Sequence, residues 1–297
     1  MHAAAHPAVD VAESVLEPPL GHLVHHGWRP RAGDPLAGLV EEIAHCDGTV
    51  LHAEERVFPS GRLDLVVHLD EPYAARRSRG AAPFPATCIT GVLAGPMLMV
   101  PPRGRARVVA VRLHPAGARA LLARPLDELG GRTLDLRDLL PRPGVGELVE
   151  RCRDARSGAG RIAAARGWLG ARLAGRADDD DDPIAAAIAW LERHHGAPPI
   201  DGLRARTGRS WARLAAAFRD RVGVTPKRYA RILRFRRALT LAHADPSATL
   251  SALALAAGYY DQAHMSVEFR ALAGLTPGAF RSSARYPGAT SVAEARR

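Results

Sequence analysis

A stretch near the C-terminus, QAHMSVEFR, combines an apolar stripe with side chains that can read the edges of bases. Met265 and Phe269 lie four positions apart, which predicts a helix with one buried side. The opposite side is flanked by Gln262, whose amide can bond adenine bidentately, and by Ser266, whose hydroxyl can bond several bases or a phosphate. Arg270 stands at the rear and is better placed for a phosphate. The stretch therefore predicts a helix that reads nucleic acid.

The neighbours of these residues extend the candidate surface. Small apolar side chains can contact a thymine methyl group. Tyr260 can stack or contact a phosphate, whereas Tyr259 is expected in the core. The competing interpretation is that all of these are ordinary solvated side chains. The expected DNA contacts of this helix are Tyr260, Gln262, Ala263, His264, Ser266, Val267 and Arg270.

A sequence of the same pattern occurs 51 residues earlier, so the C-terminal part contains an internal repeat. In each unit a short helix stops at a glycine, and a turn leads to a second helix. The second helix ends at another glycine, before a Thr-Pro pair that starts the next helix. This is the plan of a helix-turn-helix motif. The matching positions are Leu214 and Met265, Phe218 and Phe269, Gly223 and Gly274, Thr225 and Thr276, and Pro226 and Pro277.

Residues 226–243 predict one helix between the two units, and this helix carries five arginines. At 1.5 Å per residue it spans roughly 24–27 Å. Such a helix can hold two reading helices about one DNA turn, ~34 Å, apart.

The first reading helix differs from the second in its outward face, which carries alanines at 212, 215 and 216. Alanine cannot form hydrogen bonds to base edges, so we expect less base discrimination from this helix. Either its arginines bind mainly phosphates, or Trp211 repositions the helix. The expected DNA contacts of the first unit are Arg209, Ser210, Trp211, Arg213 and Arg219.

The net charge of +10 is concentrated in the same part of the chain. Residues 183–297 hold 18 basic and 7 acidic residues, whereas the preceding 182 residues hold 23 and 24. A basic domain joined to a neutral one indicates a polyanionic partner for the basic part. Double-stranded DNA is the expected partner.

Residues 184–283 resemble the C-terminal domain of the AraC/XylS family of bacterial transcription regulators. The resemblance is carried by Ser210, Leu214, Phe218 and the GVTP sequence at 223–226, and by GY, DQ, FR and GLTP in the second half. It implies two helix-turn-helix units and favours activation by contact with RNA polymerase. The stretches FPSGRLDLVVHL and VVAVRLHPAGARALL resemble a less-characterised N-terminal domain of a subset of these regulators.

The remaining sequence predicts four segments. Residues 1–176 are expected to form an α+β domain with a mainly antiparallel sheet, with strands around 49–70, 86–100 and 105–114 and helices at 115–130 and 148–175. Residues 177–183, ADDDDDP, predict an acidic linker in which Asp182 caps the next helix. The all-α DNA-binding domain is expected at 184–283, and a flexible tail at 284–297.

Other site chemistry has weak support in the sequence. Cys46, Cys88 and Cys152 are odd in number and lack CxxC spacing, so neither disulfides nor zinc are indicated, and Cys88 is expected to be a small buried hydrophobe. The histidines at 22, 25, 26 and 45 lack the spacing of a known metal site. The stretch AGPMLMV at 94–100 can line a pocket, but methionine at strand spacing is more typical of a core, so Met97 and Met99 are expected there. We predict no catalytic residues, metal or cofactor.

The interpretation is a two-domain, sequence-specific regulator of transcription, in the cytoplasm because neither a signal peptide nor a membrane span is indicated. The N-terminal domain is expected to bind a small-molecule effector or to form a homodimer. Two alternatives remain open. One is a DNA-repair methyltransferase that carries a similar DNA-binding domain, and the other is a non-specific DNA-binding protein.

Overall fold

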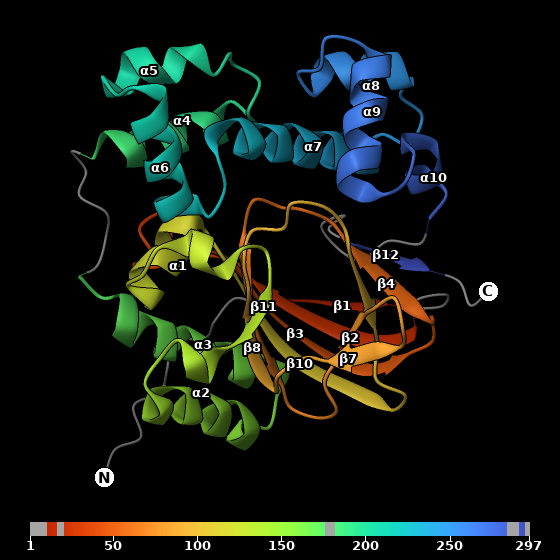
Figure 1. The fold of residues 1–297 in the computed structure, drawn as a ribbon. Helices are drawn as coiled ribbons and strands as arrows, with labels where there is room; N and C mark the ends of the chain where they lie inside the picture. The colour runs from red at the N-terminus through yellow and green to blue at the C-terminus, as the bar shows by residue number, and fades with distance from the viewer. Residues whose placement is uncertain (1–10, 17–20, 176–181, 284–290, 295–297) are drawn as a thin grey trace.

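The computed structural model describes residues 11–16, 21–175, 182–283 and 291–294. It has a sheet-rich N-terminal part and a helical C-terminal part (Figure 1), as the sequence predicts. Most of the predicted acidic linker lies outside the described residues. Asp182 does cap the following helix, because its carboxylate accepts a hydrogen bond from the backbone N–H of Ile184 at 2.9 Å.

The larger sheet has seven antiparallel strands in the order β1-β2-β3-β10-β5-β8-β11. Its central strands, β10 and β5, are rich in Val and Leu, and alternate residues of these strands are fully buried. The strands are β1 Ala12–Leu16, β2 Gly21–Trp28, β3 Val40–Val50, β5 Leu63–His68, β8 Thr87–Thr90, β10 Arg105–Leu113 and β11 Thr133–Asp135.

The smaller sheet has five antiparallel strands in the order β12-β4-β9-β6-β7. Its edge strand β12 corrects the expectation of a flexible tail, because residues 291–294 pair with β4. Residues 284–290 and 295–297 lie outside the described residues. The strands are β4 Glu54–Val57, β6 Ala74–Arg76, β7 Ala81–Pro83, β9 Met97–Val100 and β12 Ser291–Glu294.

Helices cover one face of the larger sheet (Figure 1). They are α1 Pro115–Leu122, α2 Arg142–Asp154 and α3 Gly158–Leu173, with short 3-10 turns η1 Leu126–Leu129 and η2 Leu136–Asp138. The helix expected over 115–130 was wrong in its length. It ends at Leu122, because Pro125 lacks a backbone N–H and disfavours helical geometry in the residue before it.

The C-terminal part contains the two predicted units. The first is α5 Asp201–Thr207 with α6 Trp211–Val222, and the second is α8 Leu250–Ala256 with α9 Gln262–Ala273. Helix α4 Pro183–Arg193 precedes them, α7 Pro226–Ala244 joins them and α10 Pro277–Arg281 follows. Gly223 and Gly274 end the two reading helices with φ of 90° and 67°, a backbone region that favours glycine.

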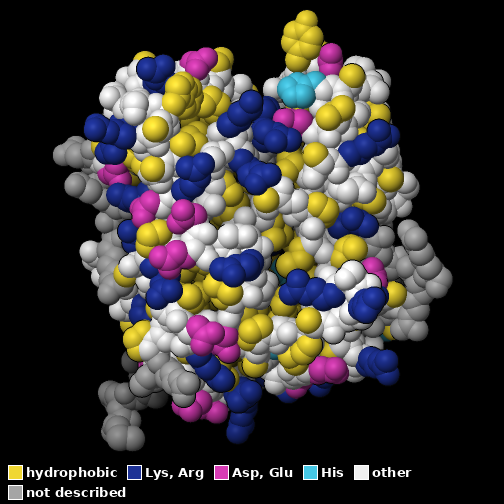
Figure 2. Space-filling view, viewed as in Figure 1, with side chains coloured by type: hydrophobic (Ala, Val, Ile, Leu, Met, Phe, Trp, Pro, Cys, Tyr) yellow, Lys and Arg dark blue, Asp and Glu magenta, His cyan; other side chains and the backbone are white. Residues whose placement is uncertain are grey.

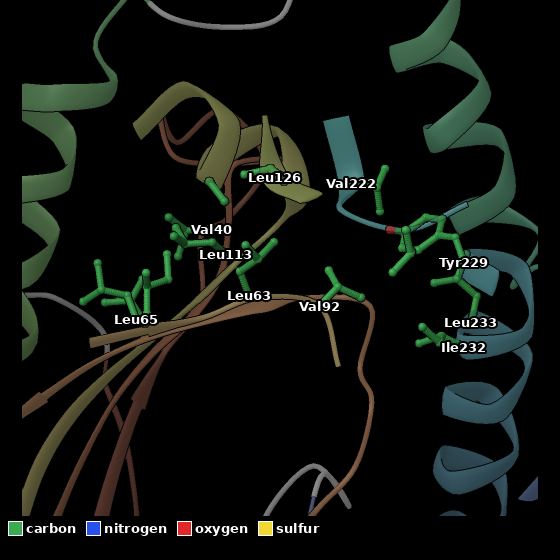
Figure 3. Packing of buried hydrophobic residues seen from close by; sticks show 14 of the residues in the cluster. Val40, Leu63, Leu65, Val92, Leu113, Leu126, Val222, Tyr229, Ile232 and Leu233 are labelled. Carbon is green, nitrogen blue, oxygen red and sulfur yellow. The ribbon is translucent and has the colours of Figure 1, made fainter. Parts of the chain in front are cut away.

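One hydrophobic core runs through both parts. Figure 3 shows Leu63 and Leu113 of the sheet on one side, Tyr229 and Ile232 of α7 on the other, and Val92 between the two groups, all in one cluster of buried residues. The two domains that the sequence predicts share this core, because the buried residues of α7 belong to the same cluster as those of the sheet. The sheet-rich part is therefore also a platform for the central helix.

Candidate nucleic-acid interface

Both reading helices turn their N-terminal ends away from the sheet-rich part. The C-terminal end of α6 rests on η1, where a Cβ added at Gly223 would lie 3.0 Å from the Leu126 carbonyl oxygen. The C-terminal end of α9 is held in the same way, because a Cβ at Gly274 would lie 3.4 Å from Pro96. The opposite ends begin at Trp211 and Gln262, and both of these residues are exposed. N-terminal residues of a recognition helix are the ones that contact base edges.

Helix α9 presents a mixed polar and apolar face. Met265 and Phe269 are fully buried, as predicted, while Val267 is 68% exposed. Tyr260, just before the helix, is 86% exposed, whereas Tyr259 is buried and its place in the core is confirmed. The remaining expected contacts Gln262, Ala263, His264 and Arg270 are exposed, and Ser266 is half-buried. Large exposed apolar groups beside donors and acceptors suit the groove of a duplex, which offers thymine methyl groups.

Gln262 is held by a side chain of the neighbouring helix. The hydroxyl of Ser251, in the first turn of α8, donates a hydrogen bond to Oε1 of Gln262 at 2.9 Å. Asp261 is the N-cap of α9 and accepts from the backbone N–H of His264 at 2.7 Å. The start of α9 is therefore ordered by side chains on both sides of the turn.

The buried side of α9 contains a carboxylate that faces the central helix. Glu268 is 7% exposed, and one of its oxygens lies 2.7 Å from Nε of Arg231. The other oxygen lies 3.6 Å from Arg234, and His264 Nε2 is 3.7 Å from Oε1. These pairs join α9 to α7 and take up part of the positive charge of α7.

Helix α6 presents a different face. Ala212 and Ala216 are exposed, and Arg209, Ser210, Arg213 and Arg219 are exposed with them. Ser210 is the N-cap of the helix. Trp211 is 37% exposed, and the guanidinium of Arg204 lies 5.9 Å from its ring centroid. Arg204 itself is exposed.

A hollow of about 570 Å³ lies between the first unit and the central helix. Its lining includes Trp211, Ala215, Lys227 and Arg234. Figure 2 shows dark blue basic side chains gathered in the valley between the two upper lobes of the molecule. This valley between the two reading helices suits the phosphate backbone, which arginine and lysine neutralise.

Helix α4, which leads into the first unit, and the central helix α7 are attached to the sheet-rich part by buried ions. Arg62, 6% exposed, lies in the β4–β5 connection; its Nε is 2.7 Å from Glu41 and its Nη1 is 2.7 Å from Glu192 of α4. It also donates to the Tyr229 hydroxyl at 3.2 Å. Arg236 of α7 lies 2.6 Å from the second oxygen of Glu41.

These ion pairs change the acidity of the two carboxyls. Burial alone raises the pKa of Glu41, but the guanidinium groups of Arg236 and Arg62 lower that pKa to about 2. Burial also raises the pKa of Glu192, but the hydrogen bond with His114 and the charge of Arg62 lower that pKa to about 2. Both carboxyls are therefore ionised at neutral pH, and the positive charge of Arg62 between them helps to stabilise both ionised forms.

The second unit is attached by aromatic packing instead. Phe58, in the same β4–β5 connection, is 2% exposed and lies with its ring centroid 6.0 Å from Phe235 and 5.9 Å from Phe280. Phe269 of α9 joins this cluster at 5.0 Å from Phe235. The connection over residues 58–62 thus contacts α4, α7 and α10.

A separate cavity of about 230 Å³ lies between the two sheets. Burial lowers the pKa of His25 and His68, and both residues line the cavity. Met97 and Met99 also line it and are half-buried, so their expected place in a packed core was wrong. The other lining residues include Leu23, Glu42, Cys46, Glu55, Asp64, Tyr73, Cys88, Thr90 and Arg112.

The cysteines and histidines are the candidates for other site chemistry. Burial raises the pKa of Cys46 and of Cys88 to about 12 and that of Cys152 to about 11. Cys88 is 2% exposed, as predicted. Among the described residues, no group of three or more His, Cys, Asp or Glu is arranged to hold a metal ion.

Sequence reasoning missed the residues that hold the reading helices in place. Arg62 lies in a Pro-Ser-Gly-Arg turn and carries no local signal of burial. Glu268 occupies a helix position four residues after His264, which is equally typical of a solvated ion pair. The contact of Ser251 with Gln262 depends on the angle between α8 and α9. The helix-turn-helix plan is the one signal in the sequence for this contact, since Ser251 and Gln262 lie in the first turns of the two helices of the second unit.

Two family models match the chain. Residues 203–283 match a helix-turn-helix domain, and residues 17–135 match a domain of unknown function, DUF6597. No curated protein matches. In the part of the chain that the structure describes, none of the helices has the length and apolarity that crossing a membrane requires.

Several solved structures resemble parts of the chain. The DNA-binding domain of AdpA, a global transcriptional factor crystallised with a target DNA, is 24% identical over 34% of this chain and 92% of its own, with a TM-score of 0.33. ToxT from Vibrio cholerae is 10% identical over 80% of this chain and 97% of its own, with a TM-score of 0.45. The xylose-binding transcription activator XylR is 16% identical over 42% of this chain and 39% of its own, with a TM-score of 0.30.

Proposed function

We propose that this chain, an AraC/XylS-type DNA-binding transcription regulator with an N-terminal DUF6597 domain, chooses its sites mainly through α9. Affinity comes mainly from arginine–phosphate contacts, and sequence choice from side chains that reach base edges. Residues 184–283 bind the duplex, and residues 1–176 regulate or dimerise. The two reading helices occupy successive major-groove segments about 10 base pairs apart.

The observation that carries this proposal is the orientation of α6 and α9. Both helices anchor their C-terminal ends on the sheet-rich part and leave their N-terminal ends exposed. The basic side chains of the valley lie between them. The exposed ends differ in chemistry, because α9 offers an amide, a hydroxyl and Val267, whereas α6 offers alanines and arginines.

Selection of bound duplexes from a random pool, followed by footprinting, tests the proposal. We expect two informative patches about 10 base pairs apart, with the stronger one under α9. The matched variants are Gln262→Ala and Arg213→Ala, each of which removes one exposed side chain. Equal affinity for random and selected duplexes at fixed salt would support the non-specific alternative and overturn sequence-specific recognition.

The cavity between the sheets supports a role for the N-terminal domain as an effector domain. Its walls combine apolar side chains with histidines and carboxylates, which suits a small molecule that has an apolar body and polar groups. The test is stabilisation of the full chain by a panel of such molecules in thermal unfolding. Ala44→Leu fills the cavity and should abolish a true shift, whereas Ala186→Leu on the exposed face of α4 should retain it.

Binding rather than catalysis is proposed for this chain. A methyl-accepting cysteine works as a thiolate, and burial opposes thiolate formation at all three cysteines. Incubation with DNA alkylated by a labelled methyl group tests this point. Label transferred to Cys46, Cys88 or Cys152 would revive the methyltransferase alternative.

Activation through RNA polymerase and homodimer formation complete the proposal. The resemblance to the regulator family supports activation through RNA polymerase. Homodimer formation is assigned to the N-terminal domain, because the C-terminal domain is assigned to DNA. A reporter driven by the selected site should rise when the protein is present, and fall in the case of a repressor. Sedimentation of the full chain, free and on DNA, measures its stoichiometry.

A further inference from the structure

Gln262 is the amide that reads bases in the proposed function, and the structure restrains it before any DNA is bound. Its Oε1 accepts the hydroxyl proton of Ser251 at 2.9 Å, and both side chains are exposed. A glutamine side chain loses rotamer freedom when it binds, and prior restraint reduces that loss. The contact also decides whether the oxygen or the NH2 group of the amide is available to a base.

An amide oxygen accepts hydrogen bonds, and an amide nitrogen only donates them. Because Oε1 of Gln262 is engaged by Ser251, the NH2 group is the free end. An oxygen that already accepts one bond has fewer directions left for a second. Bidentate contact with adenine needs both ends, since the oxygen must accept from N6 while the nitrogen donates to N7. Guanine needs donors alone, because it offers N7 and O6 as adjacent acceptors.

The first unit offers no equivalent arrangement. When the repeat is aligned, Ser251 corresponds to Asp201 and Gln262 corresponds to Trp211. A carboxylate accepts only, and an indole carries a single N–H donor. Asp201 and Trp211 both line the hollow beside α7. The oriented amide is therefore a property of the second unit.

We propose that Ser251 is the positioning residue for base recognition by α9. It holds the oxygen of Gln262 and directs the amide NH2 to the groove, so that the preferred base at this position is guanine rather than adenine. This inference rests on the proposed function, because it assumes that α9 reads a major groove.

The test is a selected-site profile of the full chain for wild type, Ser251→Ala, Ser251→Thr and Gln262→Ala. Wild type should select guanine at one position under α9. Ser251→Ala frees the oxygen and should shift that position from guanine toward adenine by about two- to tenfold, the range for one hydrogen bond. Ser251→Thr keeps a hydroxyl and should retain guanine. Gln262→Ala should lose the preference at that position alone.

Ser282→Ala is the matched control, because Ser282 is an exposed serine of the C-terminal part whose hydroxyl bonds the Gly278 carbonyl. Its profile should equal that of wild type. A wild-type preference for cytosine would mean that the amide is reversed, and a preference for adenine would mean that Ser251 does not occupy the oxygen; either would overturn the inference. So would an unchanged profile of Ser251→Ala in a protein whose Gln262→Ala variant loses the position. Absence of any sequence preference in wild type would instead overturn the proposed function.

Discussion

The two helix-turn-helix units share one plan, but they differ in what holds them and in what they present. The first unit is tied to the sheet-rich part through the preceding helix α4, whose Glu192 pairs with the buried Arg62, and its reading helix shows alanines. The second unit is held by the aromatic cluster around Phe235 and by the pairing of Glu268 on α9 with Arg231 of α7, and its reading helix shows Gln262 and exposed apolar groups.

This difference indicates a division of roles between two copies of one motif. A helix that reads bases needs polar side chains in fixed rotamers, and these must be supported by neighbours. The second unit has such support in Ser251 and Glu268. The first unit is supported mainly through α4, on the side away from the proposed DNA site. It is therefore better suited to binding phosphates than to reading bases.

Arg62→Ala should give the largest loss of stability. It leaves Glu41 and Glu192 without their shared guanidinium, and breaking a buried ion pair costs about 3–5 kcal/mol. Arg231→Ala, on α7 beside the second unit, is the matched change and should cost less, because the Arg231 side chain is about one third exposed whereas that of Arg62 is buried. Urea unfolding of both variants measures the two losses. Equal losses would contradict the unequal anchoring of the two units.

Acid should weaken the link of the first unit. Since the folded pKa of Glu192 is about 2, below its ordinary value of 4.5, the link is fully stabilising above pH 4.5. It is lost as the pH falls from 4.5 toward 2, by about 3 kcal/mol in all at 1.36 kcal/mol per unit. The Glu192→Gln variant should be less stable than wild type at neutral pH, and its stability should change less with pH between 4.5 and 2. Urea midpoints measured from pH 7 to pH 2 check this.

The control for that experiment is Glu147→Gln, which removes a half-buried carboxylate of α2 that pairs with Arg151 and Arg172 instead of Arg62. It should leave the pH profile of wild type in place. A Glu192→Gln profile as steep as that of wild type would assign the acid sensitivity to other groups.

Gln262→Ala and Arg213→Ala should separate reading from anchoring on DNA. The first should cost about 1–3 kcal/mol on the preferred site and relax one or two base pairs. The second should weaken all duplexes equally and lower the salt slope by about one unit, since one phosphate contact is lost. Binding titrations at several salt concentrations measure both. A preference that vanishes with Arg213→Ala but survives Gln262→Ala would make α6 the main reader.

Asp220→Ala should have the smallest effect. Asp220 of α6 lies 3.4 Å from Arg119 of α1, and both side chains are about one third exposed. Exposed pairs of this kind contribute about 0–1 kcal/mol. The change should therefore move the urea midpoint slightly and leave the selected-site profile unchanged. A loss as large as that of Arg62→Ala would identify α1 as a second main anchor.

The repeat, the capping residues and the glycine stops are local signals, and so the sequence alone predicts the two units and the helix between them. Asp182 and the two Thr-Pro pairs cap helices where expected. The end of α1 before Pro125 was also within reach of sequence rules. The buried stripe of Met265 and Phe269 follows from helical spacing.

Only the tertiary structure decided how the two parts meet. The burial of Arg62 depends on residues 130 and 167 positions away, and periodicity within one segment carries no record of such partners. The cavity that exposes Met97 and Met99 arises because the two sheets do not close on each other, which strand spacing cannot reveal. The choice between Oε1 and the NH2 of Gln262 likewise depends on where α8 places a hydroxyl, since free rotation of the amide is removed only by a neighbour in space.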